Sequence, residues 1–178
     1  MCAALGTQLS AQEKLSNEEV TELVWSNYLL NSKQEENQCV IDKSIYTIDY
    51  YDETLALSLS LALINVDTPL YGDLNDDGLT DFIVYVQTNG GGTAIWGQYC
   101  TFIGTEKHGE KCWVYSGSQV SRGIIFYELK QGILFGYQTK HDEDDSNCCP
   151  SLNRDVIYKW GKDKLIVVSE KEWVKESK

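Results

Sequence analysis

The feature that most constrains the fold is a succession of short segments in which apolar and polar residues alternate. In segment 46–50, tyrosine and isoleucine alternate with threonine and aspartate, and a period of two is typical of a β-strand. Strand-like residues continue in eight further segments: 55–63, 82–87, 93–103, 112–116, 123–130, 133–140, 155–160 and 164–169. Turn sequences such as Lys130-Gln131-Gly132 and Gly161-Lys162-Asp163 separate many of them. The pattern predicts a mostly antiparallel sheet of about eight or nine strands that curls or folds over on itself.

One helix is expected before the strands. Ser16-Asn17-Glu18-Glu19 has the pattern of a capping box, in which the Ser16 hydroxyl accepts from the Glu19 amide and the Glu19 carboxylate reaches back. Apolar residues then recur at helical spacing: Val20, Leu23, Val24 and Leu30. We expect a helix over about residues 17–30, packed against one face or end of the sheet. The predicted fold class is therefore α+β, mainly β.

Composition limits the protein classes. The chain has 178 residues, of which 42% are hydrophobic and 11% aromatic, which is enough for a folded core. No internal repeat is visible, and we expect one globular domain over residues 13–178. With 27 acidic and 15 basic residues, the net charge of −12 opposes binding to nucleic-acid phosphates or anionic lipid. A cation or a basic protein is the more natural partner, and no segment reaches the ~18 apolar residues of a membrane span.

The first twelve residues are mostly small or apolar and precede the first charged residues, Glu13 and Lys14. They resemble the end of a secretory signal, although no basic segment precedes them and the apolar part is short. Cys2 raises the alternative of a lipid anchor, but only Met1 stands before it, whereas an acylated bacterial cysteine follows a complete signal sequence. The N-terminus therefore favours a secreted or periplasmic protein, with lipid anchoring as the less favoured alternative.

Six cysteines accompany only two histidines, a balance that favours disulfides over zinc. No Cys-x-x-Cys pair occurs, and the adjacent Cys148 and Cys149 suit neither tetrahedral ligation nor a disulfide with each other. Cys100 and Cys112 are expected to close a hairpin, which leaves Cys39 to pair with Cys148 or Cys149. The alternative is that all six are buried thiols in a reducing compartment.

Residues 72–81 read Gly-Asp-Leu-Asn-Asp-Asp-Gly-Leu-Thr-Asp and lead into a strand-like run. They place side-chain oxygens at alternate positions, and Gly78 stands where a loop must turn sharply. Four of the side chains are placed to converge on a hard divalent cation, which takes six to eight oxygen ligands: Asp73, Asn75, Asp77 and Asp81. The segment predicts a structural Ca²⁺ site. The alternative is an Asx-rich turn whose carboxylates accept hydrogen bonds from its own amides, without an ion.

This segment is not an EF-hand, because position twelve falls on Val84, where a bidentate Glu is needed. The pattern Asp-x-Asn-x-Asp-Gly-x-x-Asp ahead of a strand resembles instead the calcium loops of the FG-GAP and integrin-propeller type. The resemblance implies five ligands: Asp73, Asn75, Asp77 and Asp81 through side-chain oxygens, and Leu79 through its backbone carbonyl. It covers only residues 72–86 and one copy, whereas a propeller stacks several blades, so the propeller fold and its ligand-binding function do not carry over.

A longer region, residues 70–168, resembles a group of small, poorly characterised bacterial envelope proteins. The shared features are the acidic loop and its strand, a glycine-rich turn at 89–93, paired hairpins, and an acidic Cys-Cys-Pro segment at 142–150. This resemblance implies export and a compact β-rich fold. It implies no reaction.

Segment 141–145, His-Asp-Glu-Asp-Asp, is the second concentration of charge. Its residue types suit a metal site or an acidic docking surface, but a solvated loop held by Cys148, Cys149 and Pro150 is the favoured alternative. His108 is expected in a turn. The glycine-rich segment 89–93 lacks the ending of a phosphate-binding loop, so a hairpin is expected there.

The strands also carry many aromatic residues. Alternating aromatics usually form core and cross-strand pairs, and the alternative is that they line a carbohydrate or peptide cleft. They are Trp96, Tyr99, Trp113, Tyr115, Phe126, Tyr127, Phe135 and Tyr137.

Two classes of function follow. The favoured one is an exported, non-enzymatic, calcium-stabilised domain that binds a protein or an envelope component. Within the binding class, the alternative is a periplasmic inhibitor or immunity protein, whose acidic surface would neutralise a basic wall-degrading enzyme. A metal-dependent hydrolase that uses His141 with segment 142–145 is the alternative from a different class.

Overall fold

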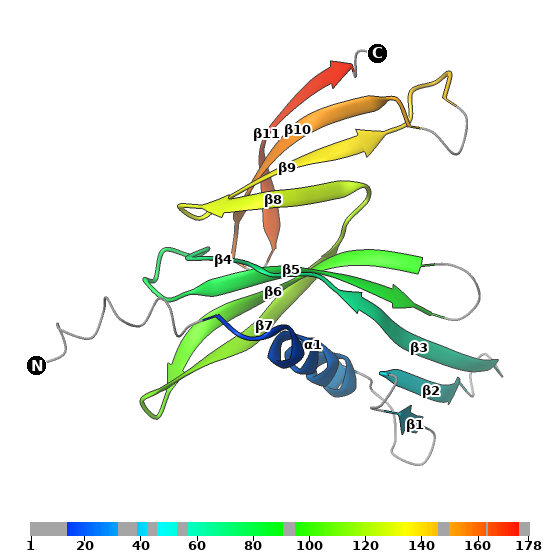
Figure 1. Ribbon diagram of the computed structural model, residues 1–178, viewed down its shortest axis with the longest axis vertical. Helices are drawn as coiled ribbons and strands as arrows, with labels where there is room; N and C mark the ends of the chain where they lie inside the picture. The colour runs from blue at the N-terminus through cyan, green and yellow to red at the C-terminus, as the bar shows by residue number, and fades with distance from the viewer. Residues whose placement is uncertain are drawn as a thin grey trace, which may run out of the picture. The chain divides into compact units, whose positions relative to one another are not determined.

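The structure is a computed structural model of the chain and describes residues 14–31, 39–42, 46–52, 57–90, 95–145, 150–162 and 164–174. These residues form one helix and eleven strands in two antiparallel sheets (Figure 1). The strands of the larger sheet are β1 (Cys39–Asp42), β2 (Thr47–Asp52), β3 (Leu57–Val66), β4 (Leu70–Gly72), β5 (Asp81–Asn89), β6 (Ile95–Lys107) and β7 (Glu110–Val120). Those of the smaller sheet are β8 (Ile124–Lys130), β9 (Ile133–Lys140), β10 (Leu152–Trp160) and β11 (Leu165–Val174).

The strand order follows the chain closely. The larger sheet has the order β1-β2-β3-β5-β6-β7, with β4 also paired to β5, and the smaller sheet has the order β11-β10-β9-β8. β3 and β4 share one edge of β5: β4 pairs with the first residues of β5, and β3 pairs with its last ones. The smaller sheet is a set of consecutive hairpins.

The prediction of a mainly β fold with one N-terminal helix is confirmed, and each of the nine predicted strands overlaps an observed one. The predicted sheet of about eight or nine strands that curls or folds over on itself differs from the structure in two respects. β1 and β4 are additional strands of four and three residues, too short to show a period. The strands also divide into two sheets between β7 and β8, where Arg122 and Gly123 both adopt positive φ angles, 47° and 79°, which are turn conformations.

Residue contacts divide the chain into two compact units. The first unit consists of residues 1–69 and 84–100, and the second of residues 70–83 and 101–178. Two of the three boundaries, 83/84 and 100/101, fall within strands, so β5 and β6 each contribute residues to the two units. The single domain over residues 13–178 stays a prediction.

In the first unit, helix α1 (Asn17–Asn31) begins at the predicted capping box. The Ser16 Oγ accepts a hydrogen bond from the Glu19 amide at 3.2 Å, and the Glu19 carboxylate accepts one from the Ser16 amide at 2.8 Å. These bonds satisfy amides that have no partner within the helix. Among the side chains of α1 that the structure describes, residues 17–27, the buried apolar ones are Val20, Val24 and Trp25. The helix packs against β3.

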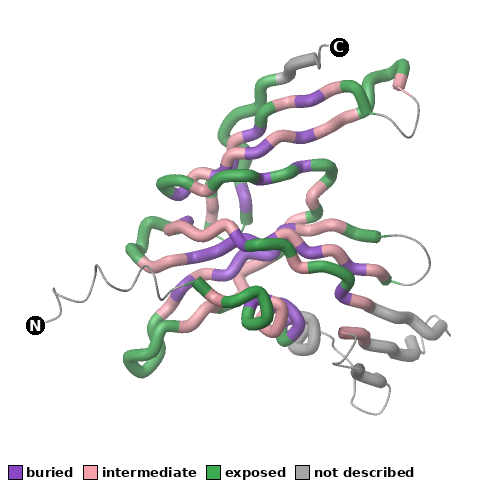
Figure 2. The backbone as a smooth tube through the Cα atoms, in the orientation of Figure 1, coloured by how far each residue is buried: buried purple, intermediate pink, exposed green. Residues whose placement is uncertain are grey.

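In the second unit, aromatic side chains of β5, β6 and β7 form a core. Phe82 stacks on Phe102 with ring centroids 4.7 Å apart, and Trp113 packs edge-on against Phe82 at 6.0 Å. Tyr115 packs in the same way against Phe102 at 5.7 Å. Buried residues run from the start of β5 and along the middle of β6 (Figure 2). The prediction that strand aromatics form the core is therefore confirmed for Trp113 and Tyr115.

The smaller sheet, also in the second unit, buries one of its faces. The buried side chains are Ile124, Phe126, Leu134, Val156, Tyr158 and Leu165. Ile125 and Tyr127 alternate with them along β8 and are exposed. The predicted hairpin turn joins β8 to β9, with positive φ at Gln131 and Gly132. This turn matters for the site, because Gly132 lies against the segment between β4 and β5.

Candidate functional site

The segment predicted to bind calcium forms a tight turn between β4 and β5. Residues 73–80 are called the acidic turn below. Positive φ angles at Asp76 (61°) and Gly78 (82°) reverse the chain, and such angles are the ones that Gly, Asn and Asp adopt at least cost. The turn delivers the chain to Asp81, the first residue of β5.

The polar side chains of the acidic turn bond to the turn itself. The Asp73 carboxylate accepts from the amides of Asp77 at 3.2 Å and Gly78 at 2.8 Å. The Asn75 Oδ1 also accepts from the Asp77 amide, and its Nδ2 donates to Asp77 Oδ2 at 2.9 Å. Asp77 Oδ1 accepts from the Leu79 amide at 2.8 Å. This is the Asx-turn arrangement that was the alternative to a calcium loop.

Asp81 anchors the acidic turn to the rest of the unit. Its side chain is 0% exposed. Oδ2 accepts from the Leu74 amide and Oδ1 from the Gly104 amide of β6, both at 2.7 Å. Desolvation, together with repulsion from Asp77 and Asp73, raises the pKa of Asp81 against the opposite effect of the two amide hydrogen bonds. One carboxylate thus joins the start of the turn to a strand 23 residues away.

The backbone next to Asp81 is held as closely. The Thr80 carbonyl accepts from the Trp113 indole Nε1 at 2.9 Å. A Cβ atom at Gly104 would lie 2.5 Å from the same carbonyl oxygen, so only glycine permits this approach. On the other side, a Cβ at Gly132 would lie 3.3 Å from the Asp73 carbonyl oxygen. The turn is held between β6 and the β8–β9 hairpin.

The predicted calcium ligands have the right chemistry, and the four side chains among them already form hydrogen bonds within the turn or to β6. All five are oxygen donors, as calcium requires. Each side-chain oxygen of Asp73, Asn75 and Asp77, and both oxygens of Asp81, already accept or share a hydrogen bond. Within the described part of the chain, no group of three or more His, Cys, Asp or Glu side chains is arranged to hold a metal ion. Calcium binding by these five residues stays a prediction.

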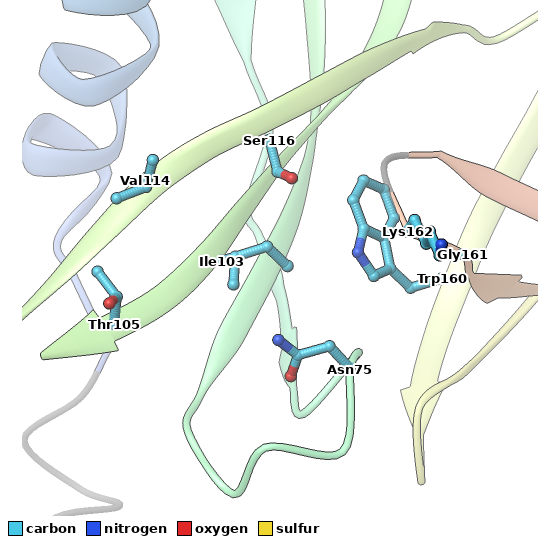
Figure 3. Close-up of a pocket in the computed structure, with 8 residues that line it drawn as sticks. All are labelled: Asn75, Ile103, Thr105, Val114, Ser116, Trp160, Gly161 and Lys162. Carbon is cyan, nitrogen blue, oxygen red and sulfur yellow. The ribbon is translucent and has the colours of Figure 1, made fainter.

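A pocket lies beside the acidic turn, within the second unit (Figure 3). Its volume is about 570 Å³, which falls in the range of small-molecule sites. The lining residues come from the acidic turn, from β6 and β7, and from the end of β10 with the turn after it: Asn75, Ile103, Thr105, Val114, Ser116, Trp160, Gly161 and Lys162. Figure 3 shows the Trp160 ring on the opposite side of the pocket from Ile103 and Ser116, with the Asn75 side chain extending from the acidic turn.

The two faces of the β6–β7 hairpin have different surroundings, one the aromatic core and the other the pocket. Phe102, Trp113 and Tyr115 point into the core, so the residues that alternate with them along the strands lie on the opposite face. Those residues line the pocket. Of the whole lining, only Asn75 belongs to the residues predicted to form a site. Trp160 was not among the residues predicted to form a site. Its position directly before the predicted Gly161-Lys162 turn was the available signal, because it places an aromatic side chain at the end of a strand.

The second acidic segment is exposed and bonded locally. The Asp145 carboxylate accepts from the amides of Asp142 at 2.7 Å and Ser151 at 2.8 Å. These bonds, the Asp142 amide first, lower the pKa of Asp145. His141 is exposed. Residues 146–149 lie outside the described part, so the interpretation as a loop held by Cys148 and Cys149 stays a prediction.

The expected disulfide between Cys100 and Cys112 is absent, so this prediction is wrong. Cys100 lies seven residues before the end of β6, and Cys112 lies two residues after the start of β7. A two-residue turn joins these strands, so the five-residue offset separates the two cysteines by about 16 Å along the hairpin. A disulfide spans at most about 7 Å between Cα atoms. The other proposed pairing involves Cys39, Cys148 and Cys149, whose side chains lie outside the described part.

The remaining candidate residues are placed as follows. His108 occupies the predicted turn between β6 and β7, with φ of 55°. Trp96 and Tyr127 are exposed rather than buried, whereas Phe126 packs edge-on against Tyr158. Most of the glycine-rich segment 89–93 lies outside the described residues.

Comparisons of the chain with protein-family models, with curated proteins and with solved structures gave no match. Among the described residues, no helix is both long and apolar enough to cross a bilayer. The functional interpretation therefore depends on the acidic turn and the pocket.

Proposed function

We propose that this protein is an exported, non-enzymatic binding domain that takes an envelope component into the pocket beside the acidic turn. The observation that carries this proposal is the pocket itself. It joins an aromatic ring, two aliphatic side chains, an amide, two hydroxyl groups and one lysine around about 570 Å³. Such a mixture of apolar surface and a few polar groups is typical of ligand sites.

The chemistry of the lining favours binding over catalysis. Its side chains include no carboxylate, imidazole or thiol, the groups that most often transfer protons or act as activated nucleophiles. The hydroxyl and amide groups donate and accept hydrogen bonds without changing their protonation state near neutral pH. Export is supported by the signal-like N-terminal residues and by the resemblance to envelope proteins.

In this proposal, the acidic turn positions a pocket residue. Two hydrogen bonds to Asp77 hold the Asn75 amide, and the bonds of Asp81 hold the turn on β6. Each amide group of this kind has more hydrogen-bonding capacity than these contacts use. Asn75 therefore keeps a donor and an acceptor site for a ligand.

Calcium is proposed as an additional stabiliser of this turn. Carboxylate oxygens that accept one amide hydrogen bond retain a second lone pair, so an ion would share or exchange the present partners. Calorimetry of the chelated protein with CaCl₂ is expected to show binding heat and a raised Tm. Asp77→Ala should abolish both, and the matched Asp144→Ala in the other acidic segment should keep them. Wild-type protein that gives neither signal would refute the calcium proposal and leave the binding proposal intact.

The binding function is tested by co-sedimentation of the full chain with an insoluble bacterial envelope preparation. Wild-type protein is expected in the pellet. Trp160→Ala is expected in the supernatant, because an aromatic anchor in a pocket often contributes most of the binding energy. Trp96→Ala is the matched control, since Trp96 is 58% exposed and lies outside the pocket.

The three proteins give distinct patterns. Retention of wild type and Trp96→Ala, but not of Trp160→Ala, supports the pocket as the binding site. Equal retention of Trp160→Ala and wild type contradicts it, as does the absence of wild type from the pellet. Circular dichroism and unfolding curves of both variants establish that each is folded.

A further inference from the structure

We infer that the ligand of the pocket is a short saccharide, bound with one ring face against Trp160. This inference rests on the proposed binding function, because it assigns the chemical class of the ligand to the same pocket. It goes further by explaining why these particular residue types surround the space. Three properties of the lining carry the argument: its apolar ring face, its neutral hydrogen-bonding groups and its charge.

The apolar part of the pocket suits a flat ligand face. Trp160 is half-buried, and its ring lies in the lining across the pocket from Ile103 (Figure 3). A pyranose ring presents its carbon-bound hydrogens together on one face, while its hydroxyl groups project around the rim. An indole ring offers a broad, rigid apolar surface with a negative π face, which complements such hydrogens. The aromatic wall thus selects a ligand that is apolar on one side only.

The polar part of the pocket suits hydroxyl groups. Ser116 and Thr105 each carry a hydroxyl that both donates and accepts, and the Asn75 amide does the same with separate atoms. Sugar hydroxyls also donate and accept, so the two sets can pair in either sense. An entirely apolar ligand would instead cover these groups without giving them hydrogen-bond partners, which weakens binding.

Charge excludes a polyanion as the ligand. Lys162 is the single charged side chain of the lining, and the adjoining acidic turn exposes Asp76 and Asp77. A phosphate-rich ligand would meet one cation and several carboxylates on a chain whose net charge is −12. A neutral ligand, or one with a single negative charge near Lys162, avoids this repulsion.

The aromatic wall is held in place before any ligand binds. The Gly161 amide donates to the Lys164 carbonyl at 2.7 Å and closes the turn directly after Trp160. A Cβ atom at Gly161 would lie 2.5 Å from Ile166 Cδ1, so the turn packs tightly on β11. A preformed aromatic surface binds with less loss of conformational freedom than a mobile one.

The inference is tested by competition in the co-sedimentation assay. One soluble competitor is the glycan fraction of the same envelope preparation, obtained after exhaustive amidase and proteinase digestion. The other is the peptide fraction, obtained after trifluoromethanesulfonic acid has cleaved the glycosidic bonds and left the peptide bonds. The glycan fraction is expected to release wild-type protein from the pellet, and the peptide fraction is not.

Two variants sharpen the result. Trp160→Ala should weaken binding of the glycan fraction about tenfold or more, and Trp160→Phe, which keeps a ring face, should lose about threefold. Release by the peptide fraction alone, or by neither fraction, overturns the saccharide assignment while wild-type retention still supports the binding function. If wild-type protein never enters the pellet, the binding function itself fails.

Discussion

Directly after the acidic turn, and again at the end of the acidic segment 141–145, a carboxylate accepts hydrogen bonds from two backbone amides that lie outside its nearest neighbours. Asp81 receives those of Leu74 and Gly104, and Asp145 receives those of Asp142 and Ser151. The bond lengths are nearly equal, between 2.7 and 2.8 Å. Judged by their hydrogen bonds alone, the two residues would be equivalent.

Burial makes them different. Asp81 is fully buried, and desolvation raises its pKa, whereas the exposed loop of Asp145 leaves the amide bonds dominant and lowers its pKa. The partners differ too, because Asp81 joins the turn to β6, and Asp145 bonds only to its own loop. The same kind of amide–carboxylate hydrogen bond therefore links two elements at Asp81 and stabilises a local loop at Asp145. Four experiments test this comparison.

The largest effect is expected from Asp81→Ala. It leaves two buried amides without an acceptor, so the free energy of unfolding should fall by about 3–5 kcal/mol. Asp81→Asn should lose roughly half as much, because its NH₂ group would face one of the two amide donors. Urea denaturation followed by circular dichroism measures both. Asp145→Ala is the matched control, and a loss as large as that of Asp81→Ala would remove the distinction between the two carboxylates.

Gly104→Ala tests how closely the acidic turn is seated on β6. Its methyl group would lie 2.5 Å from the Thr80 carbonyl oxygen, so strand or turn must shift, at a cost of about 1–3 kcal/mol in the unfolding free energy. Gly90→Ala is the control, because nothing lies within 4 Å of the added Cβ and alanine reduces the freedom of the unfolded chain. If the two variants have equal stability, the turn is not docked as tightly as the distances indicate.

Asp77→Ala is expected to cost about 1 kcal/mol, since it removes the acceptor of the Leu79 amide and the anchor of Asn75. Asp144→Ala removes the same charge from the other acidic segment and should leave thermal stability unchanged. Differential scanning calorimetry under identical salt conditions compares them. Parallel shifts in Tm would indicate that loss of negative charge, and not the hydrogen bonds of the turn, governs the response.

The smallest effects are the opposite pH dependences of the two carboxylates. The folded-state pKa of Asp81 is raised, so its stabilising contribution is present below the ordinary Asp pKa and is lost as pH rises through the raised value. The pKa of Asp145 is lowered, so its contribution is present above the ordinary value and is lost as pH falls through the lowered one. The stability difference between wild type and Asp81→Asn should therefore grow on acidification.

The corresponding difference for Asp145→Asn should shrink over the same acid range. Chemical denaturation at several pH values near and below the ordinary Asp pKa gives both differences from the same three proteins. Slopes of equal sign would show that burial does not decide the titration of Asp81.

Much of this fold could be predicted from local sequence patterns, because those patterns depend only on residues that are close together in the chain. The capping box of Ser16 and Glu19, the turn at Gln131 and the alternation along the strands all depend on spacings of a few positions. β4 has too few residues to show such a pattern. The split into two sheets depends on which strands pair, which spacing does not encode.

The site divides in the same way. The acidic turn was found from its own residues, and even its hydrogen-bonded alternative was foreseeable from Asx chemistry. Its partners were not, since Gly104 and Trp113 lie 23 and 33 positions from the atoms they bond. A glycine inside a strand pattern does indicate a close backbone approach, and Gly104 is such a residue. The pocket joins three such distant segments and requires the folded chain to be recognised.

The hydrogen bonds of Asp81 also allow the opening of the acidic turn to be followed by hydrogen exchange. The amide hydrogens of Leu74 and Gly104 point at one buried carboxylate, so each exchanges with deuterium only when that contact opens. If the turn lifts from β6 as one body, the two amides will exchange at matching rates, although they belong to segments far apart in the chain. If the Gly104 amide exchanges more slowly than the Leu74 amide, β6 stays protected when the acidic turn opens. The exchange rates of these two amide hydrogens thus report how often the acidic turn, which carries Asn75 into the pocket lining, separates from β6.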